Sequence, residues 1–437
     1  MKVLVVGSGG REHAIIWKLS QSSKVTKIYC APGNGGIAEL AECVPIKVME
    51  FDKLIDFAKE NSVDMTVVAP DDPLAVGAVD AFEAEGLRAF GPNKAAAIIE
   101  GSKAFSKDLM KKYGIPTAAY EVFDNSGQAI EYIKERNTFP VVVKADGLAL
   151  GKGVIIAEDF TTAEKAVHDI MDDKVFGAAG GKVVIEEFLT GPEISVLAFT
   201  DGKTLKPMVS AQDHKRALDN DKGLNTGGMG TFSPSRIYTP ELADECMKNI
   251  FVPTMNAMNK EGRTFKGVLY FGLMKTPNGV KVIEYNCRFG DPETQVVLPR
   301  LKSDLYEIFD AIIDERLSDI EIEWADNAAV CVVLASGGYP QKYTTGYEIE
   351  GLKQSESLGA LLFHAGTKSE NGKILTAGGR VLGVTALGSN LDDAIKKAYT
   401  FLKPIHFTDM HFMARLSETN PKVMLLTFTA NKRACSL

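Results

Sequence analysis

The sequence predicts an α/β and α+β multidomain protein with three parts: an N-terminal doubly wound parallel-sheet domain (residues 1–101), a central domain of antiparallel sheets (102–325) and a small C-terminal mixed α/β domain (326–437). Three changes of pattern predict this division. The first hundred residues alternate β-branched runs with helical patterns. Glycine-punctuated strands follow from about Ser102, and the last hundred residues combine strands with one amphipathic helix.

The N-terminal domain begins with the strand KVLVV at residues 2–6, and a helix is expected from about Arg11 to Ser20. KIYCA, MTVVA and RAF are further strands, with helices expected near residues 51–60 and 74–85. Ligands of such sheets bind where the carboxyl ends of strands meet loops. The candidate loops are Gly7–Glu12, Ala31–Gly36 and Pro70–Pro73.

The central domain starts with the helix SKAFSKDLMKKYG. FPVVVKAD, GVIIAED, KVVIEEFL and EISVLAFTDG are expected to form one antiparallel sheet, interrupted by a helix near residues 161–173. A lid subdomain is expected over about 120–192. Residues 210–236 show no periodicity, and a structureless connection of that length is usually functional when its composition is not that of a disordered segment. A helix near 240–261, two strands ending in VIEYN and a helix near 303–317 follow.

The C-terminal pattern contains AAVCVVLASGGYP, LLFHAGTK and GGRVLGVTALG, with a helix around residues 392–402. The charge balance of the whole chain, 57 acidic against 49 basic residues, argues against a nucleic-acid or membrane partner, because the net charge is -8 and no basic block is present. The six cysteines form no metal-binding spacing, and no run reaches the ~20 apolar residues of a membrane helix. The protein is therefore expected to be cytoplasmic, with small-molecule partners.

Two glycine-rich segments could hold phosphate. VVGSGGREHA ends a strand and opens a helix, but Glu12 occupies the third glycine position of a dinucleotide fingerprint, so anion binding with Arg11 is favoured over NAD. In KADGLALGKGV the P-loop register fails, because position 146 is Asp and Gly153 replaces the Ser or Thr. A hairpin tip with Lys152, beside Lys144, could still close over phosphates. The alternatives are a tight turn that binds nothing and a merely mobile hairpin.

Two strand ends carry candidate ligands. In VVIEEFLTGPE, backbone groups of Glu187 and Leu189 could meet an adenine edge and Glu193 could accept ribose hydroxyls, unless these residues are plain surface charge. In VIEYNCRFGDPE, Glu284 and Asn286 lie two apart in a strand and share a face, as oxygen ligands of a hard cation would. The alternative there is a solvated strand end.

Read in order, SKAFSKDL, KADGLALGKGV, EEFLTGPEISV, QDHKR, NTGGMG and VIEYNCRFGDPE resemble the ATP-grasp fold as it occurs in the phosphoribosylamine–glycine ligase (glycinamide ribonucleotide synthetase) family. VVGSGGREHA, APGNGG, FHAGT and GGRVL are similar to the same family, so the resemblance runs from Met1 to about Met410. It implies that ATP joins glycine to 5-phosphoribosylamine through a glycyl phosphate, giving glycinamide ribonucleotide, ADP and phosphate in purine biosynthesis.

The resemblance also implies roles for residues at matching positions. Lys103 and Lys144 would hold ATP phosphates and Glu284 and Asn286 would bind Mg²⁺ or Mn²⁺. Arg288 would meet a phosphoryl oxygen or the glycine carboxylate, with Asp213 and Lys215 beside the small substrates. The other implied ATP contacts are Gly147, Gly151, Lys152, Gly153, Glu186, Glu187, Leu189 and Glu193. The implied substrate contacts are Gly9, Gly10, Arg11, Glu12, Asn225, Thr226, Gly227 and Gly228.

The chain departs from the family pattern at Asp71 in PDDPL, at Leu224 and after Met410, where real divergence or a shifted reading frame could explain the ending. Three rivals to the implied function stay open: another ATP-grasp carboxylate–amine ligase, an NAD-dependent oxidoreductase and a nucleotide-binding protein without turnover. The sequence is consistent with a monomer or a weak dimer.

Overall fold

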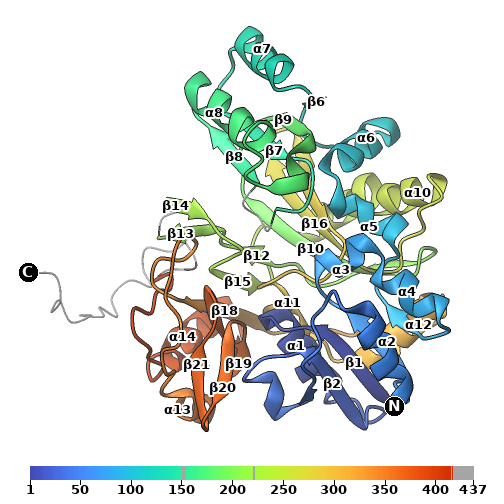
Figure 1. The fold of residues 1–437 in the computed structure, drawn as a ribbon, viewed down its shortest axis with the longest axis vertical. Coiled ribbons are helices and arrows are strands. Elements are labelled where there is room, and N and C mark those ends of the chain that lie inside the picture. Colours follow the sequence, from blue (N-terminus) through green and yellow to red (C-terminus); the bar gives the residue numbers. More distant parts are fainter. Residues whose placement is uncertain (150–152, 220–221, 415, 417–437) are drawn as a thin grey trace, which may run out of the picture.

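The computed structural model describes residues 1–149, 153–219, 222–414 and 416. The N-terminal and C-terminal parts lie side by side, and a lid carrying α7 and α8 projects from the central part (Figure 1). Gly151 and Lys152, which are expected to cover phosphates, lie outside the described residues. Within those residues no helix is both long and apolar enough to cross a bilayer.

The N-terminal sheet is parallel throughout, in the order β3-β2-β1-β4-β5, which confirms the predicted class. Its strands are β1 Lys2–Gly7, β2 Lys27–Pro32, β3 Glu42–Cys43, β4 Met65–Val68 and β5 Ala89–Phe90. Its helices are α1 Gly10–Leu19, η1 Ile37–Glu39, α2 Phe51–Glu60, α3 Asp71–Val76, α4 Ala78–Ala84 and α5 Lys94–Gly101. The prediction of one helix near 74–85 is wrong, because Gly77 adopts φ +101° and separates α3 from α4.

The lid is an antiparallel sheet in the order β6-β9-β7-β8 with two helices on it. It follows α6 Lys103–Tyr113 and contains β6 Tyr120–Phe123, α7 Ser126–Arg136, β7 Val141–Ala145, β8 Val154–Ala157, α8 Phe160–Met171, η2 Gly177–Gly181 and β9 Val183–Glu187. The lid buries its own apolar cluster between sheet and helices. It therefore forms a separate packing unit above the rest of the molecule (Figure 1).

The base of the central part is a second antiparallel sheet, β11-β10-β16-β17. Its strands are β10 Glu193–Thr200, β11 Leu205–Pro207, β16 Gly267–Thr276 and β17 Gly279–Asn286. The prediction that FPVVVKAD, GVIIAED, KVVIEEFL and EISVLAFTDG form one sheet is therefore wrong. The first three segments contain β7, β8 and β9 of the lid, whereas the fourth contains β10 of the base sheet. The chain passes from lid to base at Gly191, where φ is +146° and a Cβ would lie 2.2 Å from the Lys275 carbonyl oxygen.

Residues 210–236 are not structureless, contrary to expectation. They form β12 Gln212–Asp213, β13 Arg216–Leu218, β14 Lys222–Asn225 and β15 Gly230–Ser233. The strands β12 and β15 join the C-terminal sheet, whose order is β12-β15-β18-β22-β19. Periodicity does not show such strands because each has only two to four residues, too few for a pattern.

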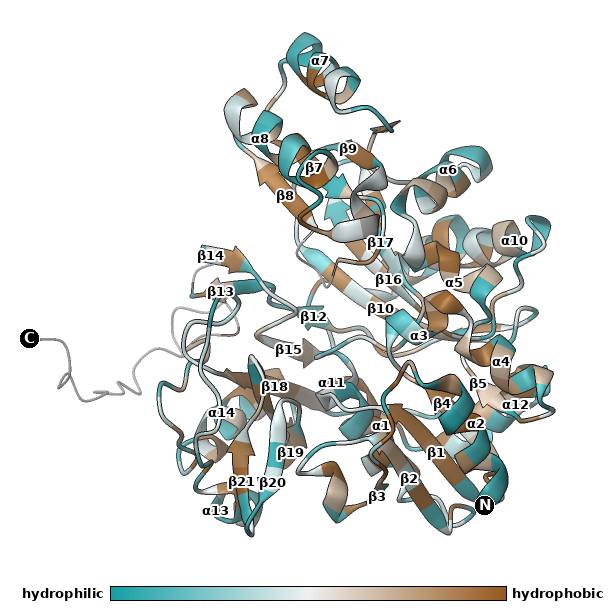
Figure 2. Cartoon of the chain, in the orientation of Figure 1, coloured by the Kyte–Doolittle hydropathy of each residue, from teal (hydrophilic) through white to brown (hydrophobic). Residues whose placement is uncertain are grey.

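The C-terminal part contains β18 Ala328–Ala335, α13 Leu352–Ser357, β19 Leu361–His364, β20 Thr367–Glu370, β21 Lys373–Thr376, β22 Arg380–Gly388 and α14 Leu391–Phe401. Two helical segments flank the base strands β16 and β17 along the chain. Between β15 and β16 lie α9 Pro240–Cys246, the π-helical turn η3 Met247–Phe251 and α10 Val252–Lys260, and between β17 and β18 lie α11 Thr294–Val297, η4 Leu298–Arg300, α12 Leu305–Ile313 and η5 Leu317–Asp319. Strands β1, β2 and β8 are largely hydrophobic, whereas α7 carries mostly polar residues (Figure 2).

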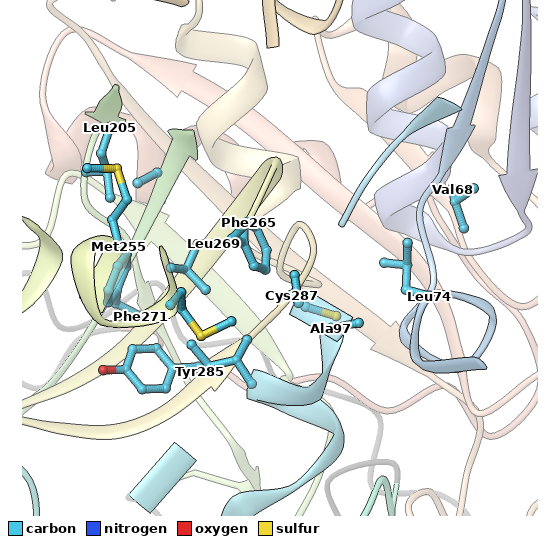
Figure 3. Close-up of a cluster of buried hydrophobic side chains, with 14 of the residues drawn as sticks. Val68, Leu74, Ala97, Leu205, Met255, Phe265, Leu269, Phe271, Tyr285 and Cys287 are labelled. Carbon is cyan, nitrogen blue, oxygen red and sulfur yellow. The ribbon is translucent and has the colours of Figure 1, made fainter. Parts of the chain in front are cut away.

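One apolar core joins the N-terminal domain to the base sheet. Figure 3 shows Val68 and Leu74 from the N-terminal sheet side approaching a cluster that contains Phe271 and Cys287. Because these side chains are buried together, the carboxyl end of β17 is fixed against the N-terminal domain. The residues that follow β17 are thereby fixed beside the parallel sheet.

Candidate active site

The centre of the site is the end of β17, where Glu284 and Asn286 project from the same face of the strand, as strand alternation predicts. Glu284 pairs in register with Gly272 on β16, next to a bulge. A Cβ at Gly272 would lie 2.9 Å from Glu284 Cγ, so the Glu284 side chain occupies space that only glycine leaves open. Both side chains are half-buried.

Cationic side chains surround Glu284. Lys215 Nζ lies 3.1 Å from Glu284 Oε1 and 3.5 Å from Glu193 Oε2. The positive charge of Lys215 holds the pKa of Glu284 down to about 2 against the opposing effect of burial, with Lys144 and Lys103 lowering it further. The carboxylate is therefore ionised at neutral pH and can serve as a hard oxygen ligand.

The donor set fits a small divalent cation that is completed by ligand oxygens. Within the described part of the chain, no three His, Cys, Asp or Glu side chains converge as a metal cluster. The Glu284 carboxylate and the Asn286 amide oxygen would therefore have to be supplemented from outside. Mg²⁺ is commonly held in this way, by one or two protein oxygens together with phosphate and water.

The two lysines expected at the phosphates lie on different elements near Glu284. Lys103 opens α6 and donates from Nζ to the Gly147 carbonyl at 2.9 Å, where the lid begins its glycine-rich turn. Burial lowers the pKa of Lys103, opposed by Glu284. Lys144, on β7, lies 3.0 Å from Glu186 Oε1. Both ammonium groups thus lie on the lid side of the β17 end.

The residues expected near the base and ribose of a nucleotide, from Glu186 to Glu193, differ from one another in their contacts. Glu186 is buried, and its carboxylate contacts Lys107 and Lys144. Glu187 donates its amide to the Ala119 carbonyl at 2.9 Å and pairs with Lys281 at 2.7 Å. Leu189, half-buried, and Glu193, at the start of β10, follow where the chain leaves the lid.

Arg288, just beyond β17, is held by two carboxylates of the N-terminal domain. Its Nη2 lies 2.8 Å from Glu100 Oε1 and 3.5 Å from Asp71 Oδ2. Glu100 also accepts the Cys287 amide at 2.7 Å. Burial disfavours the charge of Arg288, but Glu100 and Asp71 raise its pKa overall, so the guanidinium stays charged. The sequence analysis gave no role to Glu100. The feature of the sequence that could have indicated one is an acidic residue at the end of the apolar helix KAAAIIEG.

The loop containing Asn225, Thr226, Gly227 and Gly228 is fixed from two sides. Gly228 adopts φ +113°, and a Cβ there would lie 2.4 Å from Pro292 Cδ and 2.7 Å from Asp213 Oδ1. Arg380 donates from Nη1 to the Gly227 carbonyl at 2.7 Å and to the Asp291 carbonyl at 2.8 Å. The C-terminal part thus supports this loop through Arg380, a residue that GGRVL contains but to which the sequence analysis gave no role.

Asp213 lies beside that loop. Burial, and then the negative charge of Glu293, raise its pKa well above the usual range for a carboxyl group, opposed by Lys215 and Arg380. Glu293 itself is buried and accepts hydrogen bonds from Ser195 and Tyr270 at 3.0 Å each. The structure therefore brings Asp213, Lys215 and Glu284 into one connected electrostatic group.

In the N-terminal domain, Glu12 lies in the first turn of α1 and caps the start of that helix. Its Oε2 accepts the Gly9 amide at 2.5 Å and its Oε1 pairs with Arg11 Nε at 2.6 Å. Arg11 also donates to the Phe289 carbonyl at 3.3 Å, and its backbone amide points to Asp291 Oδ2 at 3.3 Å. A Cβ at Gly10 would lie 2.6 Å from Gln295 Nε2, so this turn packs closely on α11.

The C-terminal part also reaches the APGNGG loop. Asn34 Nδ2 donates to the carbonyls of Ser8 and His364 at 2.8 Å each. The His364 amide donates to His13 Nδ1 at 2.8 Å. Burial lowers the pKa of His13 to about 3 and that of His364 to about 4, so both rings are neutral at physiological pH. Hydrogen bonds therefore join the loops 7–12 and 31–36 of the N-terminal domain to the C-terminal part.

Three family profiles together match most of the chain. They are the phosphoribosylglycinamide synthetase N domain over residues 1–100, its ATP-grasp (A) domain over 101–294 and its C domain over 329–414. The phosphoribosylamine–glycine ligase of Clostridium acetobutylicum is 50% identical over 412 residues, which are 94% of this chain and 98% of that protein. That of Halalkalibacterium halodurans is 51% identical over 405 residues, or 93% and 94% of the two chains.

Solved structures agree with these matches. The crystal structure of phosphoribosylamine–glycine ligase from Thermotoga maritima superposes with a TM-score of 0.81 at 34% identity, covering 94% of this chain and 99% of that one. The biotin carboxylase domain of Hydrogenobacter thermophilus 2-oxoglutarate carboxylase, solved with MgADP and bicarbonate, gives a TM-score of 0.70 at 16% identity over 94% and 91% of the chains. The second likeness shows the shared fold only.

Proposed function

The chain belongs to the phosphoribosylglycinamide synthetase family, and from this premise we propose how its residues carry out that family's reaction. The enzyme is an ATP-dependent carbon–nitrogen ligase. It joins glycine to 5-phosphoribosylamine and releases glycinamide ribonucleotide, ADP and phosphate, a step of purine biosynthesis. The observation that carries the assignment of roles is the group of three lysines around the ionised Glu284 at the end of β17.

The first half of the reaction is phosphoryl transfer to glycine. A glycine carboxylate oxygen attacks the γ-phosphorus, the bond to the β-phosphate bridging oxygen breaks, and ADP leaves with that electron pair. Because two anions approach each other, positioning and charge neutralisation supply most of the catalysis. We assign the neutralisation to Lys103 and Lys144 on the lid side and to Lys215, whose Nζ lies 3.1 Å from Glu284 Oε1.

A divalent cation completes the phosphate site in this proposal. Glu284 and Asn286 would hold Mg²⁺ or Mn²⁺, whose chemistry when bound is to neutralise and orient phosphate oxygens. Before a nucleotide binds, Lys215 compensates the charge of Glu284. Binding of a cation therefore requires Lys215 to share this carboxylate, or to turn toward Glu193, its second partner.

The second half is attack by the 1-amino group of phosphoribosylamine on the carbonyl carbon of glycyl phosphate. Phosphate leaves with the electrons of the broken C–O bond and takes up the proton that the amine loses. We assign the phosphoribosyl group to the α1 turn, where Gly9, Gly10 and Arg11 present a helix N-terminus, with Glu12 capping the same turn. We place glycine near Asp213 and the loop 225–228, with Arg288 fixed beside the reacting carboxylate by Glu100.

Water must be kept from glycyl phosphate, which would otherwise hydrolyse. The lid is an independently packed sheet above β17, and Gly147 at its glycine-rich turn already contacts Lys103. We propose that the lid closes over ATP, with Gly153 in the covering turn and Glu187, Leu189 and Glu193 at the base and ribose. The contacts of the Glu186 carboxylate with two lysines support a role beside the phosphates.

The test is a coupled ADP-release assay with ATP, glycine and phosphoribosylamine, in which each component is omitted in turn. ADP release should require both glycine and phosphoribosylamine, and the product should be glycinamide ribonucleotide by mass. Faster ADP formation with another amine would assign the chain to a different ligase. We also propose that the enzyme works in the cytoplasm. We propose further that it is a monomer or a weak dimer, and light scattering of the purified protein would check this oligomeric state.

A further inference from the structure

Lys107 is a buried cation to which the reaction assigns no role. It lies on α6 and is 2% exposed, which places it among the largest essentially buried side chains of the described residues. Its Nζ lies 2.8 Å from Glu186 Oε2 and donates to Thr117 Oγ1 at 2.8 Å. Because a buried ammonium group loses its hydration, such a residue persists only where other groups compensate it.

Lys107 and Lys144 share a single carboxylate. Oε2 of Glu186 lies 2.8 Å from Lys107 Nζ, and Oε1 lies 3.0 Å from Lys144 Nζ. Burial alone would raise the pKa of Glu186, but Lys144 and Lys107 together lower it, so the carboxylate is ionised. Burial lowers the pKa of Lys107 only to about 8, since Glu186 opposes it, and the ammonium is still charged at neutral pH. Two positive charges therefore face one negative charge.

Lys107 is also the more firmly bound of the two lysines. It has two partners at 2.8 Å, whereas Lys144 has the ion pair at 3.0 Å and a long contact of 3.4 Å to the Ile283 carbonyl. Thr117 in turn donates to the Val282 carbonyl at 2.8 Å, which ties Lys107 to the base sheet where the lid begins. Lys107 thus neutralises Glu186 from a fixed position.

We propose that Lys107 is a positioning residue that takes up the charge of Glu186, so that the positive charge of Lys144 remains available to the ATP phosphates. Without Lys107, Lys144 and Glu186 would form a one-to-one ion pair, and Glu186 would offset more of the positive charge that Lys144 presents to the nucleotide. The inference rests on the proposed function of Lys144 as a phosphate ligand. It predicts that ATP binding depends on the balance of charges, more than on the Lys107 side chain itself.

The experiment compares Lys107→Met, Glu186→Gln and the double variant by titration calorimetry with ATP and with adenosine, each with Mg²⁺ and without glycine. Lys107→Met should weaken ATP binding about tenfold, the scale of one lost charged interaction, and leave adenosine binding within about threefold. The double variant, which restores one excess positive charge, should recover most of the lost ATP affinity. Lys111→Met, on the exposed side of α6, is the matched control and should bind ATP as the parent does.

Unchanged ATP affinity in Lys107→Met would overturn the inference, as would equal losses for ATP and adenosine or a double variant no better than the single one. If Lys107→Met does not fold, the double variant should fold and bind ATP within about threefold of the parent, because its charge balance is restored. Failure of both to fold would make Lys107 a structural residue and refute the proposal. Turnover of the parent with all three substrates separates this outcome from failure of the proposed function.

Discussion

Glu284→Gln is the change that tests the site most directly, because it removes one negative charge and keeps the shape of the side chain. The carboxylate is the group around which Lys215, Lys144 and Lys103 are arranged. We expect kcat/KM to fall at least about 100-fold, the scale of losing a group that stabilises transferring charge, and the Mg²⁺ requirement to rise. The fold should survive, because Gln makes the same steric contacts with Gly272.

The expected stability cost follows from the pKa of Glu284. A fall from 4.5 to about 2 corresponds to roughly 3 kcal/mol at 1.36 kcal/mol per pKa unit. The side chain is 33% exposed, so solvent screening reduces this to about 1–2 kcal/mol. The lowered pKa means that this stability is present above pH 4.5 and is lost as the pH falls toward 2. At neutral pH the variant should therefore melt only a few degrees lower.

The assay is initial-rate ADP release over a range of Mg²⁺ concentrations, with melting followed by circular dichroism. Glu261→Gln is the matched control, since Glu261 also pairs with a lysine, Lys112 at 2.6 Å, but lies away from the site. The control should keep full activity. Should Glu284→Gln retain more than about a tenth of the parent activity at low Mg²⁺, the assignment of this carboxylate to the cation would be refuted.

Three further outcomes are expected. Lys144→Ala should raise the ATP KM about tenfold or more in steady-state assays, and a change confined to the glycine KM would contradict its role. Gly228→Ala should lose most activity, because its Cβ would lie 2.4 Å from Pro292 Cδ at φ +113°; normal kinetics would refute the close packing of this loop. Neutral His13 and His364, with pKa values of about 3 and about 4, contribute full stability above pH 6.5, which should fall by up to about 1.4 kcal/mol per pH unit for each ring as the pH drops toward 4. Denaturant titration of His13→Gln should show a shallower acid dependence, and an unchanged slope would disprove this linkage.

The sequence predicts those features that depend on neighbouring residues. Strand alternation alone places Glu284 and Asn286 on one face, and the alternating βαβ pattern of the first hundred residues predicts the parallel sheet. The roles assigned to Glu187, Leu189 and Glu193 at the base and ribose stay predictions. The contacts of these residues could be described only from the structure.

The features that escape sequence reasoning depend on partners far apart in the chain. Arg288 meets Glu100 across 188 residues, and Arg380 reaches the Gly227 carbonyl across 153. Sequence pattern shows that EISVLAFTDG is a strand but not which sheet it joins, because a strand's periodicity is the same in both. Likewise, nothing in KVVIEEFL indicates that Glu186 turns inward between two lysines.

The C-terminal sheet combines strands from two distant segments of the chain, and this limits how the enzyme could be divided or recombined. Its edge strand β12 and the next strand β15 come from residues 212–233, whereas β18 begins only at Ala328. A break in the chain near residue 325 would leave β15 with an open side of unpaired peptide groups and would strip β18 of one neighbour. If the protein is split in two, or if its C-terminal part is moved to another protein, residues 212–233 would therefore have to stay with the C-terminal fragment for both pieces to be soluble.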